Sequence, residues 1–176
     1  MPRIEPFSTE KVDEAVAATF AEIEGAFGMV PNLFRTYAYN PALLEANWNK
    51  VKALMMGGVL DRKVKEAIAV LVSKDNSCAY CVAAHTMALR SIGVSEEEIA
   101  ALEDDLQKAG FSSKEEALMQ FARRANLAPR DITDVEFQAV RDLGATDAEI
   151  VEALGVMELF TGFNKFLDTL QVDLDF

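Results

Sequence analysis

The stretch DNSCAYCVAAHTMAL, residues 75–89, contains both cysteines of the chain and its only histidine. Thiolates and imidazoles attack peroxides and disulfides, move protons and bind metal ions. If the stretch forms a helix, Cys78, Cys81 and His85 fall at i, i+3 and i+7 and share one stripe. The spacing pairs His85 with Cys81, one turn away, and leaves Cys78 as the second thiol.

The two thiols also occupy a favourable place for reactivity. A helix cap predicted at Asn76 or Ser77 puts both in the first turn, where free backbone N–H groups and the helix dipole favour an anion. This lowers a thiol pKa and increases the fraction of thiolate, which is the reactive form. An adjacent imidazole can accept the thiol proton, and the thiolate can attack a peroxide to give a sulfenic acid. A neighbouring thiol can then close a disulfide.

Glu66 is the candidate acid that would orient the histidine. It lies beside the apolar positions Val64, Ala67 and Ile68 of the preceding predicted helix. Only a few residues join that helix to the cysteine helix, so the two must pack as antiparallel neighbours. We therefore expect the Glu66 carboxylate to reach a group on the next helix.

Other interpretations compete with a redox site. Cysteines and a lone histidine can be ordinary buried side chains, but here all of them converge on one stripe. A zinc site could use both thiols, His85 and Glu66, yet structural zinc usually draws a second ligand pair from a distant segment, and the chain has no further Cys or His. Haem attachment needs a histidine where Val82 stands. A thioredoxin-like site needs strands, which the pattern does not offer.

Composition limits the partners. The chain has 176 residues, 51% of them hydrophobic, and a formal net charge of −12. We expect one domain over residues 1–176, with its active-site core at about 60–99. The charge argues against nucleic acid as a partner. No apolar run approaches the ~18 residues of a membrane span, and MPRIEPFSTE lacks a secretory signal, so we expect a cytoplasmic protein. The high apolar fraction predicts surface buried between subunits.

Helix start and stop signals recur along the chain and strict alternation does not, which predicts an all-α fold. Helices are predicted to begin at Ser8–Thr9, Asn40, Asp61 and Asn76–Ser77, and at four capping boxes, Ser95/Glu98, Ser112/Glu115, Thr133/Glu136 and Thr146/Glu149. The first is predicted to end near Phe27, the second at Gly57–Gly58 and the cysteine helix at Gly93.

One internal echo is visible. LRSIGVSEEEI (89–99) and VRDLGATDAEI (140–150) match at an offset of 51 residues. In both, a helix end containing Arg meets a Gly, and a capping box then opens the next helix. The match indicates either recurrent helix–Gly–helix chemistry or a duplicated two-helix unit, and the second copy lacks the cysteines.

With Glu66, then twelve residues later Cys78-x-x-Cys81, then His85, the chain resembles the alkyl hydroperoxidase D (AhpD)-like group of the carboxymuconolactone decarboxylase family. GMVPNLFRTYAYNPALLEA (28–46) resembles the peroxidase-related branch of that family. The resemblance implies a single-domain AhpD-like helical bundle that assembles into dimers, trimers or hexamers. It also implies no metal, haem or other cofactor, and an external dithiol or redox-protein reductant.

The resemblance assigns a role to each site residue. Cys81 would attack the peroxide and Cys78 would resolve the sulfenic acid. His85 and Glu66 would form the proton relay, which predicts a Cys81 pKa below its ordinary ~8.5. Cys78 is nearer the helix start, but a base one turn from Cys81 outweighs a dipole effect of ~0.3–1 kcal/mol. Well-studied members carry a second histidine where this chain has Tyr80, whose phenol (pKa near ~10) is a poor base but can donate a hydrogen bond in support.

The sequence therefore predicts a thiol-dependent peroxidase or disulfide oxidoreductase that reduces alkyl hydroperoxides. Two alternatives stay open. One is a non-catalytic, redox-responsive oligomer whose disulfide alters assembly or partner binding. The other is a carboxymuconolactone decarboxylase-type enzyme, because those relatives do not need the cysteine pair. Turnover of a hydroperoxide with a dithiol separates the first prediction from the redox-responsive oligomer.

Overall fold

The computed structural model describes residues 1–9 and 12–175, which fold into α-helices joined by short connections, with no strand in this part of the chain. The all-α prediction is confirmed. The helices are α1 (Glu14–Phe27), α2 (Asn32–Tyr37), α3 (Pro41–Val51), α4 (Arg62–Asp75), α5 (Ala79–Ser91), α6 (Glu96–Ala101), α7 (Ser113–Leu127), α8 (Asp134–Asp142) and α9 (Asp147–Leu170). A π-helical turn, Lys52–Met56, extends α3, and a 3₁₀ turn, Pro129–Asp131, precedes α8. Over the described residues, no helix combines the length and apolarity that crossing a membrane requires.

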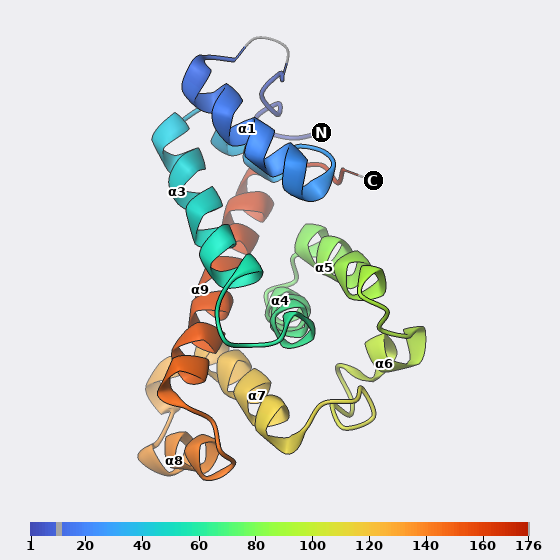
Figure 1. Cartoon of the computed structure of the whole chain (residues 1–176), viewed down its shortest axis with the longest axis vertical. Helices are drawn as coiled ribbons and strands as arrows, with labels where there is room; N and C mark the ends of the chain where they lie inside the picture. Colours follow the sequence, from blue (N-terminus) through green and yellow to red (C-terminus); the bar gives the residue numbers. More distant parts are fainter. Residues whose placement is uncertain (10–11, 176) are drawn as a thin grey trace.

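Helix α4 is the centre of the fold. It packs against α5, α7 and α9, and Figure 1 shows it enclosed by these three helices. Ten consecutive residues of α4, from Val64 to Ser73, are buried. A helix buried on all sides requires apolar or fully paired side chains around its whole circumference. Glu66 and Ser73 are therefore buried on α4, which packs against α5.

Most predicted helix starts are confirmed. All four capping boxes form, and the Asn40 side chain accepts from the Leu43 N–H ahead of α3. The prediction for the first helix was wrong: α1 begins only at Glu14, where the Asp13 side chain accepts from the Val16 N–H. A carboxylate at this position satisfies a free donor and complements the helix dipole, so it supersedes the earlier Ser8–Thr9 signal.

The start of the cysteine helix also differs from the prediction. Cys78 itself is the N-cap residue of α5, not Asn76 or Ser77. Asn76 instead ends α4, and Ser77 has a left-handed backbone, with φ of 61°. Residues 76–78 link the two helices, which is the short connection expected from the sequence, and α4 packs against α5.

The two echoed segments share the chemistry of a helix junction. In both, a glycine with positive φ ends the first helix and a capping box opens the next. In both, an arginine of the first helix pairs with an acidic residue in the first turn of the second: Arg90 with Glu96, and Arg141 with Asp147. The likeness stops there, because α6 has 6 residues and α9 has 24.

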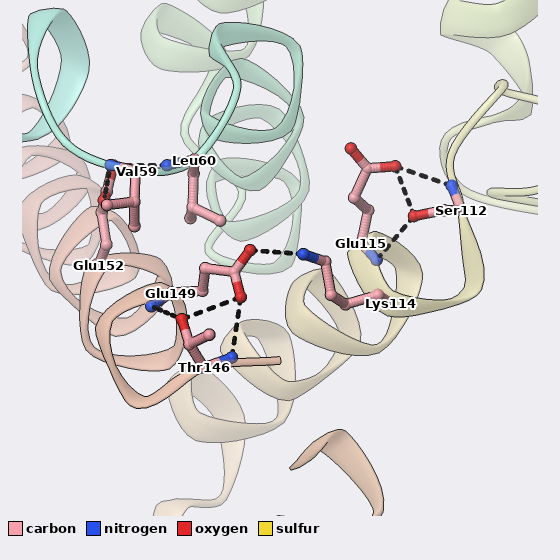
Figure 2. A network of polar contacts seen from close by, with 8 residues as sticks. All are labelled: Val59, Leu60, Ser112, Lys114, Glu115, Thr146, Glu149 and Glu152. Atoms are coloured by element: carbon pink, nitrogen blue, oxygen red, sulfur yellow. Dashed lines mark hydrogen bonds and ion pairs between the residues drawn. The ribbon is translucent and has the colours of Figure 1, made fainter. Parts of the chain in front are cut away.

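Polar contacts hold the N-terminal half of α9 against its neighbours, as Figure 2 shows. The Glu149 carboxylate belongs to the capping box of α9 and also accepts from Lys114 at the start of α7, at 2.6 Å. One turn along, Glu152 accepts from the backbone N–H groups of Val59 and Leu60, in the loop before α4. Both contacts fix the register of α9 against the core.

The chain ends lie side by side. The Arg3 N–H donates to the Leu170 carbonyl at 2.8 Å, and both termini lie at the same end of the molecule in Figure 1. Beyond α9, residues 171–175 run past the start of α5. This C-terminal segment is anchored by the Asp175 carboxylate, which accepts from the Asn32 N–H and from the Tyr80 hydroxyl.

Candidate active site

The two thiols lie at the start of α5 and are almost fully enclosed. The exposed fractions of Cys78 and Cys81 are 0% and 2%, and both are free thiols. Cys78 is the cap and Cys81 is the third helical residue, so the two side chains meet across the first turn. The Cys81 thiol donates a hydrogen bond to the Cys78 sulfur.

This hydrogen bond separates the pKa values of the two thiols. The pKa of Cys78 is lowered overall, chiefly by this hydrogen bond. The backbone N–H of Cys81 acts in the same direction, and burial of the thiol opposes both. The same hydrogen bond, followed by burial, raises the pKa of Cys81 well above its ordinary value. The prediction of a lowered Cys81 pKa was therefore wrong for the reduced pair. The cap position makes Cys78 the better site for the anion, and Cys81 keeps the proton.

Two buried polar side chains face Cys81 from behind. Asn164 of α9 and Ser73 of α4 both hydrogen bond to the Cys81 sulfur, and each lowers its pKa. The Asn164 amide also donates to the Ser73 hydroxyl at 2.9 Å, and it accepts from Asn76 at 3.0 Å. Both Asn164 and Ser73 are 0% exposed. Hydrogen-bond donors held in a dry site stabilise an anion without reorganisation, so this pair favours a thiolate on Cys81 whenever the proton leaves.

Sequence reasoning missed Asn164 and Ser73. Each is a common residue within an apolar helical stretch, FTGFNKF and AVLVSKD. The one signal available was polarity at a position that the helical period places on a buried face. Their partner is on another helix, so only the packing of α4, α5 and α9 identifies what they bind.

The structure brings Glu66 and His85 together, as expected from the short link between their helices. The His85 Nδ1 lies 2.6 Å from a Glu66 oxygen. The Glu66 side chain is only 6% exposed, and Arg62 approaches its other oxygen at 3.5 Å. The imidazole ring meets the Phe160 ring edge-on at 4.4 Å between centroids. Glu66 and Phe160 thus fix both the position and the tilt of the ring.

This contact also decides which nitrogen of His85 is basic. A carboxylate only accepts, so the hydrogen bond places a proton on Nδ1 and leaves the Nε2 lone pair free in the neutral ring. His85 and Cys81 are one helical turn apart on α5, on the same face. In the reduced pair, the strongest interactions of the Cys81 thiol are with Cys78, Asn164 and Ser73, not with the imidazole.

Tyr80 points away from the relay. Its hydroxyl donates to the Asp175 carboxylate and accepts from the Leu33 N–H at 3.4 Å. Burial, and then Asp175, raise the pKa of Tyr80 far above its ordinary value. Tyr80 therefore anchors the C-terminal segment, and any support it gives to the thiols passes through that segment. It does not replace the second histidine of well-studied relatives as a base.

The four residues that a zinc site could use, Cys78, Cys81, His85 and Glu66, do not form a group that could hold a metal ion. Over residues 1–9 and 12–175, no group of three or more His, Cys, Asp or Glu side chains is arranged to hold a metal ion. Glu66 binds His85, and the thiols bind one another.

Comparisons with known proteins show which proteins the chain resembles. Residues 41–124 match the model of the Carboxymuconolactone decarboxylase family. Alkyl hydroperoxide reductase Rv2159c from Mycobacterium tuberculosis is 32% identical over 107 residues, which are 61% of this chain and 31% of that protein. The chain therefore matches less than a third of the length of this relative.

Two solved structures share the fold over nearly the whole chain. The first is an alkylhydroperoxidase AhpD core, a peroxidase-related protein from Ralstonia eutropha, with a TM-score of 0.87, 25% identity, and coverage of 99% of this chain and 92% of that one. The second is a peroxidase-related protein from Silicibacter, with a TM-score of 0.86, 24% identity, and coverage of 98% and 91%. The resemblance predicted from the sequence is confirmed: residues 41–124 match the model of the carboxymuconolactone decarboxylase family, and the fold matches that of AhpD-core proteins.

Proposed function

We propose that this protein is a thiol-dependent peroxidase that reduces alkyl hydroperoxides to alcohols through the Cys78–Cys81 pair, and that an external dithiol or redox protein returns the pair to its reduced form. The observation that carries the proposal is the placement of one ionisable thiol pair, a buried set of anion-stabilising donors and a carboxylate-bound imidazole within two turns of α5. The similarity to a protein named alkyl hydroperoxide reductase supports the same reaction, although the match covers only 31% of that relative.

In the first step, the Cys81 proton passes to Nε2 of His85, while the Glu66 carboxylate stabilises the imidazolium. The Cys81 thiolate attacks the terminal oxygen of the hydroperoxide, so an S–O bond forms and the O–O bond breaks. The alkoxide leaves and takes the proton from His85, which gives the alcohol. Because the pKa of Cys81 is raised, this thiol needs a base to form the thiolate, and His85 is the base one turn away.

In the second step, the Cys78 thiolate attacks the sulfenic sulfur of Cys81. An S–S bond forms, and hydroxide leaves and takes a solvent proton to become water. In the reduced pair the pKa of Cys78 is lowered, chiefly by the hydrogen bond from Cys81, which favours the thiolate form that attacks in this step. The two thiols have lost two electrons to the peroxide, and a dithiol must supply two electrons before the next cycle.

The test is a steady-state assay of organic hydroperoxide consumption with dithiothreitol as reductant. We expect turnover by the wild type and none by Cys81→Ser. Cys78→Ser should consume one equivalent of peroxide and then stop at a sulfenic acid that dimedone traps. Mass spectrometry of the oxidised wild type should show a loss of two hydrogens per chain, from a disulfide within one molecule.

Two results would contradict the proposal. Equal peroxide consumption by the wild type and Cys81→Ser would exclude the thiol mechanism. A disulfide that forms but never turns over would instead favour the non-catalytic, redox-responsive oligomer. A main product linked between chains on a non-reducing gel would remove the role of Cys78 as resolving thiol.

A further inference from the structure

Asp168 lies against the buried thiol of Cys78. Its carboxylate is within hydrogen-bond range of the Cys78 sulfur, and its charge opposes ionisation of that thiol. Cys78 is 0% exposed, whereas Asp168, in the last turn of α9, is exposed to solvent. The carboxylate is therefore a polar connection between the enclosed sulfur and bulk water.

A pocket of about 220 Å³ opens at this carboxylate. The pocket is lined by Ala79 and Tyr80 of α5, by Leu167 and Asp168 of α9, and by Gln171, Val172 and Leu174 of the C-terminal segment. The pocket thus borders Ala79, which follows Cys78 in the chain, and Asp168, whose carboxylate lies within hydrogen-bond range of the Cys78 sulfur. A small molecule in this pocket would lie beside Ala79 and Asp168, which are the neighbours of the enclosed Cys78 sulfur.

Helix stability does not explain an aspartate at this position. The last turn of α9 contains no basic residue, and a carboxylate at a helix C-terminus is disfavoured by the helix dipole. The other titratable groups at this end include Tyr80 and Cys81 of α5, Asp173 and Asp175 of the C-terminal segment, and Arg3, which binds the Thr169 carbonyl. Arg3 donates to backbone and Asp175 is held by Tyr80, so Asp168 is the acid directed at a thiol.

We propose that this pocket is where a small dithiol reductant reaches the oxidised pair, and that Asp168 is the catalytic base that accepts the proton of the attacking thiol. This inference rests on the proposed function for its place in the cycle. The pocket walls carry no cationic side chain, and the chain has a net charge of −12. An uncharged dithiol therefore fits the site better than an anionic thiol such as glutathione.

The reductive step balances through these residues. One thiol of the reductant gives its proton to Asp168, and the resulting thiolate attacks the Cys78 sulfur. The Cys78–Cys81 bond breaks, and Cys81 leaves as a thiolate that Asn164 and Ser73 stabilise. The product is a mixed disulfide between Cys78 and the reductant.

A second exchange then frees the pair. The remaining reductant thiol gives its proton to the Cys81 thiolate and attacks the reductant sulfur of the mixed disulfide. Cys78 leaves as the thiolate, the reductant departs as a cyclic disulfide, and Asp168 releases its proton to solvent. The pair is again in the state that the structure favours, with the anion on Cys78 and the proton on Cys81. Both reductant electrons have passed to the pair.

The test measures the reductive step alone. The protein is oxidised with diamide rather than peroxide, so the measurement does not depend on peroxidase activity. The oxidised protein is then mixed with dithiothreitol, and samples are quenched in acid, alkylated and analysed by mass spectrometry.

Asp168→Asn should slow reduction by about 10²-fold near neutral pH, the usual size of a general-base contribution. The defect should shrink as pH rises past the reductant thiol pKa, roughly 8.5–9, because the reductant then ionises unaided.

Asp173→Asn is the matched control. It removes the same charge from the C-terminal segment, and the recorded hydrogen bond of Asp173 uses its backbone carbonyl, which the variant keeps. We expect this variant to be reduced at the wild-type rate. We also expect reduction of the wild type by glutathione to be slower than by dithiothreitol at equal thiolate concentration.

Three outcomes would overturn the inference. If Asp168 acts only as a neighbouring charge, Asp168→Asn will speed reduction, since the Cys78 thiolate becomes a better leaving group and a reductant thiolate approaches more easily. An equal loss in Asp173→Asn would assign the effect to the overall charge of the segment. A defect that does not change with pH would assign it to structure. If reduction behaves as expected but peroxide is not consumed, the proposed function fails and the reductive site stands.

Discussion

At the Cys78–Cys81 pair, the unit that titrates is the pair and not either thiol. The shared hydrogen bond lowers the pKa of Cys78 and raises that of Cys81, so the pair loses its first proton more easily than its second. A lone thiol beside an imidazole would have needed a low pKa to react. Because the pKa of Cys81 is raised, Cys81 needs a base to become a thiolate. His85, which Glu66 holds in place, is the base that we propose for this step.

Replacing His85 by Ala should slow the reaction of the reduced pair with peroxide by on the order of 10²-fold or more, because Cys81 then has no base one turn away. Glu66→Gln should act in the same direction but more weakly, since Nε2 remains and only its orientation is disturbed. Rapid-quench measurement of disulfide formation gives both rates.

Met87→Ala is the control for His85→Ala. Met87 lies two residues further along α5 and is 45% exposed, so its loss changes the helix surface without touching the pair. If His85→Ala and Met87→Ala react with peroxide equally fast, the relay is wrong and His85 is a structural residue beside a redox pair.

The residues that could be predicted from the sequence are those with rare types and fixed spacing. Cys78, Cys81 and His85 share one helix, and Glu66 lies on the helix joined to it by a short link, so local geometry was enough to bring them together. Asp168 could not be found in this way. It meets Cys78 from α9, and its distance along the chain carries no information about the contact. Which thiol holds the proton also depended on packing, namely on Cys78 being the cap.

At the scale of elements, helix starts were predicted well wherever two side chains cooperate. Each capping box combines a hydroxyl with a glutamate three residues later, and all four formed. Single residues were less informative: α1 uses Asp13 rather than Ser8–Thr9, and α2 was not predicted at all. Helix α2 has 6 residues, too few to show a period, and it is held by burial of its side chains instead.

The loop before α4 is attached to α9 through one carboxylate, and this should make stability depend on pH. Glu152 pairs with the buried Lys65 at 2.7 Å and accepts from two backbone N–H groups, and these contacts lower its pKa below 4.5 against the opposing effect of burial. A carboxyl with a lowered folded-state pKa adds stability above its unfolded value of about 4.5 and loses it as pH falls through the folded value.

Glu152→Gln should therefore reduce stability near neutral pH by about 3–5 kcal/mol, because the buried Lys65 loses its counter-charge and keeps only the Gly57 carbonyl as a partner. The difference from wild type should narrow below about pH 4, where the wild-type carboxyl also loses its charge. Chemical denaturation at a series of pH values measures it. A constant difference across the series would show that the ion pair is not the cause.

Gly58 tests the same attachment from the backbone side. Its φ is +91°, and a Cβ built there would overlap the Glu152 carboxylate. Gly93 has φ of +86° with no atom within 4 Å of its Cβ position, so Gly93→Ala bears only the backbone strain of about 1–2 kcal/mol. Gly58→Ala should lower the denaturation midpoint clearly more than Gly93→Ala. Equal shifts of the two midpoints would mean that the Glu152 side chain can move away from the new Cβ at little cost.

At the scale of the whole molecule, the helices at the end opposite the chain termini leave large apolar side chains in solvent. Leu127, Val135, Leu143 and Val151 are 61%, 79%, 48% and 69% exposed. Between α7 and α8 there is also a groove of about 580 Å³, lined largely by apolar residues and by Arg123 and Arg124. Apolar surface gathered in this way is typical of contacts between subunits.

We therefore predict that the protein assembles with copies of itself and that light scattering at micromolar concentration gives a mass above the 19.3 kDa of one chain. Leu143→Glu should reduce that mass, because a buried charge without a partner opposes association. Leu174→Glu is the matched control: Leu174 is 47% exposed, close to the 48% of Leu143, but it lies on the C-terminal segment at the other end of the molecule. Its variant should assemble like the wild type. A 19 kDa particle for the wild type would remove the prediction, and equal loss in both variants would place the interface elsewhere.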